Sequence, residues 1–237
     1  MFADDTNFFF SHDNKDVLFK TVNSELSKVS VWFRANKLSL NLSKTKYSLY
    51  HPANKKEFIA NGTLPALMID GDIIQREHQT KFLGILIDEN LSWKPHISLI
   101  GHKISKNIGA LYRARCILSK QQTKQLYFSF VHCYLNYANI AWASTHQCKL
   151  KPLYRQQKHS ARLIYFKDRL EHAKPYLYEM KILSVYQINL FQTLCFMFKC
   201  KLNTIPDIFN DLFRTKKQIS IPCALMDSSQ NLTKKLN

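Results

Sequence analysis

The spacing of apolar residues changes near Trp93, and this change limits the folds open to the chain. Before it, short apolar runs alternate with turn residues and with one amphipathic segment over residues 16–35. After it, apolar residues recur every three or four positions, which is the period of an α-helix. The sequence therefore predicts the α+β class, with short strands and one helix over residues 1–92 and an all-α region over 93–213. We expect the polar residues 214–237 to form a disordered tail.

The first region is expected to hold short strands around its helix. The run 6–10 is apolar enough for a strand, and Ser11 and Asp13 are candidate caps for the helix that follows. Asn36 is the residue expected to end that helix in the left-handed conformation. Alternating leucines over residues 38–42 predict a further strand, followed by a basic turn and another strand over 46–51.

Two glycines in this region carry a local prediction. Asp70-Gly71 stands between apolar runs, which is the signal for a tight hairpin because glycine tolerates a positive φ. Residues 80–88 are apolar almost throughout and predict one strand buried on both faces. Within that strand, Gly84 would allow another segment of backbone to approach closely.

The helical region opens with a strongly two-sided segment. Its branched apolar residues fall within an arc of about 80° at 100° per residue, and three basic residues lie on the far side. The apolar set is Ile97, Ile100, Ile104, Ile108 and Leu111, and the basic set is Lys103, Lys106 and Arg113. One face of this helix should pack while the other stays cationic.

Three more helices are expected. Ser119 begins a capping-box pattern for a helix that runs to about Trp142. Pro152 suits the first turn of a helix ending near Phe166. The segment 186–202 is apolar nearly all round, so we expect it to be central.

The distribution of charge points to a polyanionic partner. Residues 90–167 contain 13 Lys and Arg residues and no Asp or Glu, whereas residues 1–89 contain 11 of each kind. Chance would place about five or six of the chain's acids in such a stretch. Nucleic acid fits this better than a membrane does, and aromatic residues interleave the basic ones as base stacking requires. The alternative is a solvated basic face with no specific partner.

Cysteine usage and hydropathy indicate the compartment. The six cysteines form no C-x-x-C pair and no zinc-like spacing with histidine, so we expect reduced thiols. No apolar run approaches the ~20 residues of a membrane helix, and the acidic start is unlike a signal peptide. We therefore expect an intracellular protein, nuclear or cytoplasmic and not secreted, with no membrane partner.

Asp4 and Asp5 are the candidate metal ligands. Adjacent carboxylates in a tight turn repel each other unless a divalent cation neutralises both. Mg²⁺ takes hard oxygen ligands and often binds one or two carboxylates together with substrate phosphates, as in polymerases and nucleases. The alternative is a solvated turn.

Several segments, in this order and spacing, resemble one enzyme family. The resemblance is to the C-terminal part of reverse transcriptases encoded by non-LTR retrotransposons of the jockey-like kind, and it covers residues 1 to about 213. It rests on "FADDT", "WFRANKLSLNLSKTKYSLY", "TKFLGILIDENLSWKPHI" and "ISKNIGALYRARCILS".

The resemblance implies a role for each segment. Phe2, Ala3, Asp4 and Asp5 match the metal-binding box of the polymerase palm, and Lys44 or Lys46 matches a lysine beside the phosphates of the incoming nucleotide. Phe82, Leu83 and Gly84 match the primer-grip hairpin, and the helices after Trp93 match the thumb and connection. The implied cofactor is Mg²⁺, bound weakly, and the implied partners are an RNA template and a DNA primer.

The resemblance also implies that this chain is a fragment. In the family, fingers and an early palm with a third metal-binding aspartate precede the box, so we expect a missing N-terminal half and no activity from this chain alone. One alternative is a non-catalytic helical module that binds nucleic acid. Another is a product that folds poorly, because an unpaired strand edge invites aggregation.

Overall fold

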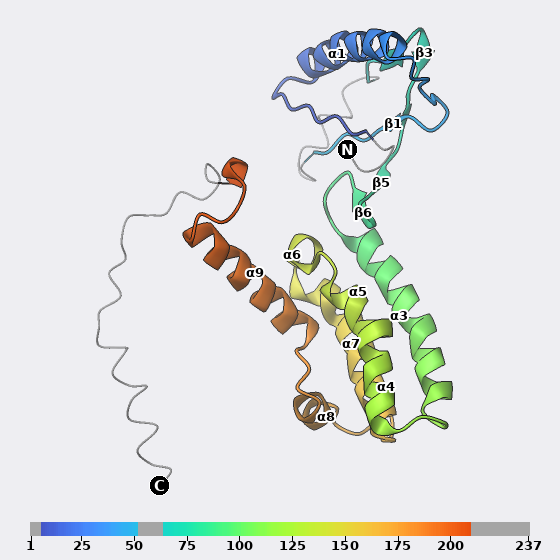
Figure 1. Cartoon of the computed structure of the whole chain (residues 1–237), viewed down its shortest axis with the longest axis vertical. Coiled ribbons are helices and arrows are strands. Elements are labelled where there is room, and N and C mark those ends of the chain that lie inside the picture. Colours follow the sequence, from blue (N-terminus) through green and yellow to red (C-terminus); the bar gives the residue numbers. More distant parts are fainter. Residues whose placement is uncertain (1–5, 52–63, 210–237) are drawn as a thin grey trace, which may run out of the picture. The chain divides into compact units, whose positions relative to one another are not determined.

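The computed structural model describes residues 6–51 and 64–209 (Figure 1). The chain divides into two compact units. The first unit extends to Asn189 and the second begins at Leu190. Phe2, Asp4, Asp5 and the tail 214–237 lie outside the described residues. The described part is a mixed α+β structure in which helices predominate, as the sequence predicted at the level of class.

Helix α1, Lys15–Ala35, is the amphipathic segment expected from the sequence, but its ends differ in detail. Its cap is Asn14, not Ser11 or Asp13, because the Asn14 side chain accepts bonds from the amides of residues 16 and 17 at 2.8 and 3.2 Å. Asn36 is not left-handed. Its side chain donates to the Trp32 carbonyl at 2.8 Å, and the positive φ of 56° falls one residue later.

The strands are short and form three two-stranded sheets. β1 (Lys46–Tyr47) pairs in parallel with β4 (Gln75–Arg76), and β2 (Met68–Ile69) pairs antiparallel with β3 (Asp72–Ile73). The predicted Asp70-Gly71 hairpin is confirmed, with φ of 56° and 91° at the two turn residues, as a type I′ turn requires.

The other strand predictions need correction. Residues 6–10 form no strand in the described part of the chain, and Phe9 instead lies edge-on to Phe82 at 6.0 Å. The alternating leucines over 38–42 lead into a turn, because the amides of residues 44 and 45 bond back to the Asn41 carbonyl. The strand expected over 46–51 is only the two residues of β1.

The run 80–88 is a hairpin and not one strand. β5 (Gln79–Phe82) pairs antiparallel with β6 (Ile85–Asp88), and Leu83 and Gly84 form the two-residue turn. Their φ values of 46° and 81° are those of a second type I′ turn. Leucine at a position that usually carries Asn or Asp concealed this turn in the sequence.

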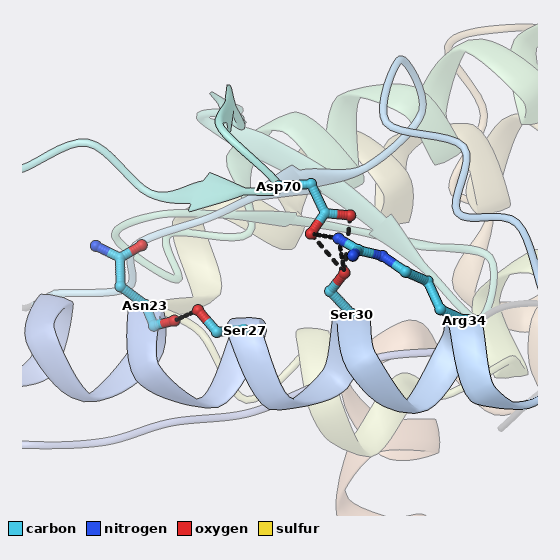
Figure 2. A network of polar contacts seen from close by, with 5 residues as sticks. All are labelled: Asn23, Ser27, Ser30, Arg34 and Asp70. Carbon is cyan, nitrogen blue, oxygen red and sulfur yellow. Dashed lines mark hydrogen bonds and ion pairs between the residues drawn. The ribbon is translucent and has the colours of Figure 1, made fainter.

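Figure 2 shows how α1 holds the hairpin β2–β3. Ser30 donates to both carboxylate oxygens of Asp70 at 2.6 and 2.7 Å, and Arg34 pairs with the same carboxylate. Asn23 donates to the Ala66 carbonyl and accepts from the Met68 amide, each at 3.0 Å. The same region contains a small apolar core, made of Phe19, Leu26, Leu49, Leu67, Ile69 and Ile74.

The helical region begins with α3, Lys94–Ala114, whose buried and exposed faces are those predicted. Helix α4, Lys120–Tyr127, opens with the predicted capping box between Ser119 and Gln122. It does not continue to Trp142. A π-helical turn, η1 (Phe128–His132), leads into α5 (Cys133–Asn136), and a left-handed Ala138, φ 47°, separates α5 from α6 (Asn139–Trp142).

Helix α7, Gln147–Ile164, packs against α3 and α4, and α8 (Lys174–Glu179) follows it. Pro152 lies inside α7 and not in its first turn, since His146 caps the helix six residues earlier. Gln157 is fully buried on α7, where it donates to the Tyr127 hydroxyl at 3.0 Å and accepts from the Val185 amide at 3.1 Å. This bond set satisfies polar groups inside an otherwise apolar core.

Helix α9, Val185–Lys201, is where the last prediction fails. Within its described residues only Val185 and Ile188 are buried. The apolar side chains further along, in the second unit, are exposed and not packed: Leu190, Phe191, Leu194, Met197 and Phe198. A short 3₁₀ turn, η2 (Asp207–Phe209), follows, and Phe209 lies edge-on to Phe196 at 5.7 Å.

Candidate nucleic-acid interface

The tip of the hairpin β5–β6 and the helical region enclose a hollow of about 290 Å³. Gly84 and Lys103, which the sequence singled out separately, both line it. Its aromatic lining residues are Tyr134, Tyr137 and His96, and Leu99, Ile100 and Cys133 complete the lining. The structure thus joins a hairpin turn, a cation and stacking rings at one place.

The hairpin tip is fixed by hydrogen bonds from the helical region. The Tyr137 hydroxyl donates to the Leu83 carbonyl at 2.7 Å, and the Leu86 amide donates to His96 Nδ1 at 3.1 Å. Tyr137 reaches the tip because the break after α5 turns it out of the helix. A Cβ on Gly84 would lie 3.7 Å from the Tyr137 ring, so glycine is needed here for its φ more than for space.

Asp88 organises the link between the hairpin and α3. Its carboxylate accepts from the amides of Ser92 and Trp93, both at 3.0 Å, in place of the side-chain cap that Trp93 itself lacks. Burial opposes ionisation of Asp88, but these hydrogen bonds outweigh it and lower its pKa. Lys149 on α7 also donates to the Ser92 carbonyl at 2.8 Å, which anchors the link from the other side.

His96 is the buried polar residue of the site. Burial, and then the nearby charge of Lys103, lower its pKa. Because Nδ1 accepts a bond from the Leu86 amide, the neutral ring carries its proton on Nε2. Nε2 is buried and has no partner in the described part of the chain. The His96 ring lies edge-on to Trp142 with centroids 5.7 Å apart.

The cationic face of α3 is formed by Lys103, Lys106 and Arg113, all exposed. Lys103 Nζ lies 5.5 Å from the centroid of the Tyr134 ring, and within the described residues none of the three pairs with a carboxylate. Ten residues of helix separate the first from the last, a span of roughly 15 Å. A face of this length can follow several phosphates of a nucleic-acid backbone.

The lack of counter-ions extends beyond this face. Of the 13 cations in residues 90–167, Lys120 pairs with Glu179 at 3.1 Å and Lys167 with Glu171 at 3.7 Å. The others form no ion pair with any described carboxylate. Their charges are therefore available to an external anion.

Phe82 and Leu83 differ in how far their side chains are exposed. Phe82 is half-buried against Phe9, whereas the Leu83 side chain is 48% exposed at the tip. A bulky residue with a φ of 46° is strained, and such strain is often kept where a side chain has a task.

The structure separates the two candidate lysines. Lys46 Nζ pairs with Glu77 at 2.7 Å, whereas Lys44 is exposed and its ammonium has no partner among the described residues. Of the two lysines, Lys44 is therefore the one whose ammonium is available to bind a phosphate. Asp4 and Asp5 supply hard oxygen donors suited to Mg²⁺, but they lie outside the described residues. Residues 6–51 and 64–209 contain no cluster of three potential metal ligands.

Sequence reasoning missed Asp88, His96 and Tyr137. Asp88 stands four residues before Ser92 and is a recognisable loop-capping residue. His96 and Tyr137 had no local signal, because their roles depend on contacts with the hairpin tip that no spacing rule encodes.

Comparison with known proteins adds no relative: no family model, no curated protein and no solved structure matches this chain. The function must therefore be argued from its own geometry. Among the described helices, none combines the length and apolar character needed to cross a bilayer.

Proposed function

We propose that this chain is the palm-remnant and thumb part of a reverse transcriptase, and that its helical region binds the RNA template–DNA primer hybrid. The observation that carries the proposal is the cationic face of α3, which runs without carboxylate partners beside a hollow lined by the hairpin tip. Polyanion binding needs such uncompensated charge, and the nearby rings suit contacts with sugars and bases.

In this proposal the chemistry belongs to the complete enzyme. Asp4 and Asp5 would hold Mg²⁺, which when bound activates the primer hydroxyl and stabilises the leaving pyrophosphate. Lys44 would neutralise charge on the phosphates of the incoming nucleotide. The hairpin tip would orient the primer strand, with Gly84 supplying the positive φ that its turn needs.

Hybrid binding is tested by fluorescence anisotropy with a labelled RNA/DNA hybrid over a range of salt concentrations. Replacing Lys103, Lys106 and Arg113 by Gln should weaken binding at least tenfold near 0.1 M salt. It should also reduce the salt slope by about two to three, since each lost phosphate contact removes close to one counterion.

A matched control removes three charges elsewhere. Lys20→Gln, Lys37→Gln and Lys174→Gln change exposed residues outside the proposed interface and should leave the slope nearly unchanged. Equal losses in both triple variants would mean that net charge alone drives binding, and the proposed interface would be wrong.

A second candidate is a nucleic-acid-binding module without catalysis. It is supported by the cationic face of α3, whose uncompensated charge suits nucleic-acid binding without requiring a catalytic centre. Mg²⁺-dependent primer extension, measured with the complete enzyme and abolished by Asp4→Ala, separates the two. Extension supports the polymerase, whereas tight hybrid binding without extension supports the binding module.

A further inference from the structure

Three arginines and a histidine lie at or near the C-terminal ends of α3 and α7. Arg115 is the residue that caps α3, and Arg162 is in the last turn of α7, one turn after His159. Arg169 follows α7 on an exposed segment. We call Arg115, His159, Arg162 and Arg169 the arginine cluster.

Ring contacts join the two helix ends. The Arg115 guanidinium carbon lies 4.5 Å from the centroid of Tyr112 on α3 and 5.4 Å from that of Phe166 just after α7. Arg162 Nη1 donates to the Glu171 carbonyl at 3.2 Å. These contacts fix two of the guanidinium groups without neutralising them.

The cluster has no counter-ion among the described residues. The Glu171 carboxylate is engaged by the Tyr176 hydroxyl at 2.6 Å and by Lys167 at 3.7 Å, and Asp168 forms no ion pair. The Nε atoms of Arg115 and Arg162 are buried without a partner. Burial, and then the charges of Arg162, Arg169 and Arg115, lower the pKa of His159.

The helix dipoles of α3 and α7 alone do not explain why these cations lie together. The negative end of a helix dipole typically favours one cation by about two- to fivefold in equilibrium terms, and the effect fades beyond the last turn. Here the contact of Arg115 with Phe166 brings a cation from α3 to the end of α7, where Arg162 lies in the last turn. Guanidinium groups that converge in this way match the oxygens of a phosphate.

Exposed rings flank the cluster. Tyr112 is 54% and Phe166 is 60% exposed, although each also contacts Arg115. Free ring faces beside a phosphate-binding group are the combination by which proteins hold unpaired nucleotides, because a base inside a duplex offers no face for stacking.

We propose that the arginine cluster binds a phosphodiester of single-stranded nucleic acid while Phe166 or Tyr112 stacks the adjoining base. The inference rests on the proposed function only in the class of partner, nucleic acid. Its site is distinct from the cationic face of α3, so a single strand and the hybrid would contact different residues.

The test measures binding of labelled 12-nucleotide single strands, one RNA and one DNA, to the full chain by fluorescence anisotropy near 0.1 M salt. Arg162→Gln with Arg169→Gln should weaken single-strand binding at least tenfold and leave hybrid binding within about twofold. The triple variant of Lys103, Lys106 and Arg113 should show the opposite pattern. If the proposed function fails but this inference holds, the single strand binds while the hybrid does not.

Two further variants separate binding from misfolding. Arg169→Gln changes an exposed side chain that makes no hydrogen bond or ion pair in the described structure, and it should still cost several-fold in affinity. Phe166→Ala should cost roughly tenfold. Its matched control, Tyr178→Ala, removes an exposed ring on α8 and should change nothing.

His159 provides a direct reporter by NMR. A phosphodiester at the cluster should raise the pKa of His159, because a bound anion favours the imidazolium. Unchanged affinity in the Arg162/Arg169 variant, or an unchanged His159 pKa with oligonucleotide bound, would overturn the proposal. A response to inorganic phosphate without oligonucleotide binding would overturn the single-strand assignment.

Discussion

At the scale of single residues, the two type I′ turns invite comparison. Asp70-Gly71 uses a residue that tolerates positive φ, whereas Leu83-Gly84 places a bulky side chain in the same conformation. For most residues the left-handed conformation costs about 1–2 kcal/mol, and Asn or Asp avoids part of this. The Leu83 side chain is therefore held at a cost in stability, at the tip that borders the hollow.

Leu83→Asn should make the fold more stable but weaken the binding of the hybrid. We expect the free energy of unfolding to rise by about 1 kcal/mol, because the strain is relieved while the Leu83 carbonyl still accepts from Tyr137. Affinity for the hybrid should fall several-fold if the leucine touches nucleic acid. Urea unfolding and anisotropy measure the two effects.

His96 should make stability depend on pH. Its folded pKa lies below the unfolded value of 6.5, so the unfolded state binds more protons as the pH falls through that value. Stability is lost as the pH drops below 6.5 and levels off below the folded pKa.

His96→Asn keeps an acceptor for the Leu86 amide but does not titrate. The difference in unfolding free energy between the wild-type chain and this variant should therefore shrink from pH 7.5 to pH 5.5. A constant difference would show that His96 is not held neutral. Comparing the two chains cancels the contributions of other histidines.

At the scale of elements, the sequence predicted best what local periodicity encodes. The extents of α1 and α3 follow from an apolar stripe opposite polar residues, and the capping box at Ser119 is a local pattern. The run 80–88 was misread because a hairpin and a buried strand share one apolar composition, and only φ at Leu83 distinguishes them. The docking of that hairpin against Tyr137 is a long-range contact, which no local rule provides.

Tyr137→Phe should loosen the hairpin tip without unfolding the helices. The lost hydrogen bond to the Leu83 carbonyl contributes about 1 kcal/mol, since the ring remains in place. Hydrogen exchange of the Ile85 and Leu86 amides should speed up, while amides inside α3 keep their protection. Uniformly faster exchange would mean that Tyr137 supports the whole helical region.

At the scale of the whole molecule, the chain carries a formal net charge of +17, and residues 90–167 provide 13 of its cations without one acid. Like charges on one region repel in the folded state, and a bound polyanion relieves that repulsion. Stability and partner binding should therefore be linked.

The melting temperature should accordingly rise when an RNA/DNA hybrid is added at 50 mM salt, because a ligand that binds only the folded state stabilises it. The rise should disappear near 0.5 M salt, as counterion release predicts. Differential scanning fluorimetry provides the measurement. A cooperative transition in the absence of ligand would also argue against the poorly folding alternative, whereas a broad transition would favour it.

The parallel pairing of β1 with β4 has a consequence for how the chain is made. Among the described residues, the strand partners of Lys46 and Tyr47 are Gln75 and Arg76, so β1 is synthesised about 30 residues before its ladder can form. Before the hairpin β2–β3 has been synthesised, α1 has no hairpin to pack against, and its apolar face is accessible to chaperones. Because of this order of synthesis, β1 cannot form its sheet until the residues of β4 have been added to the chain.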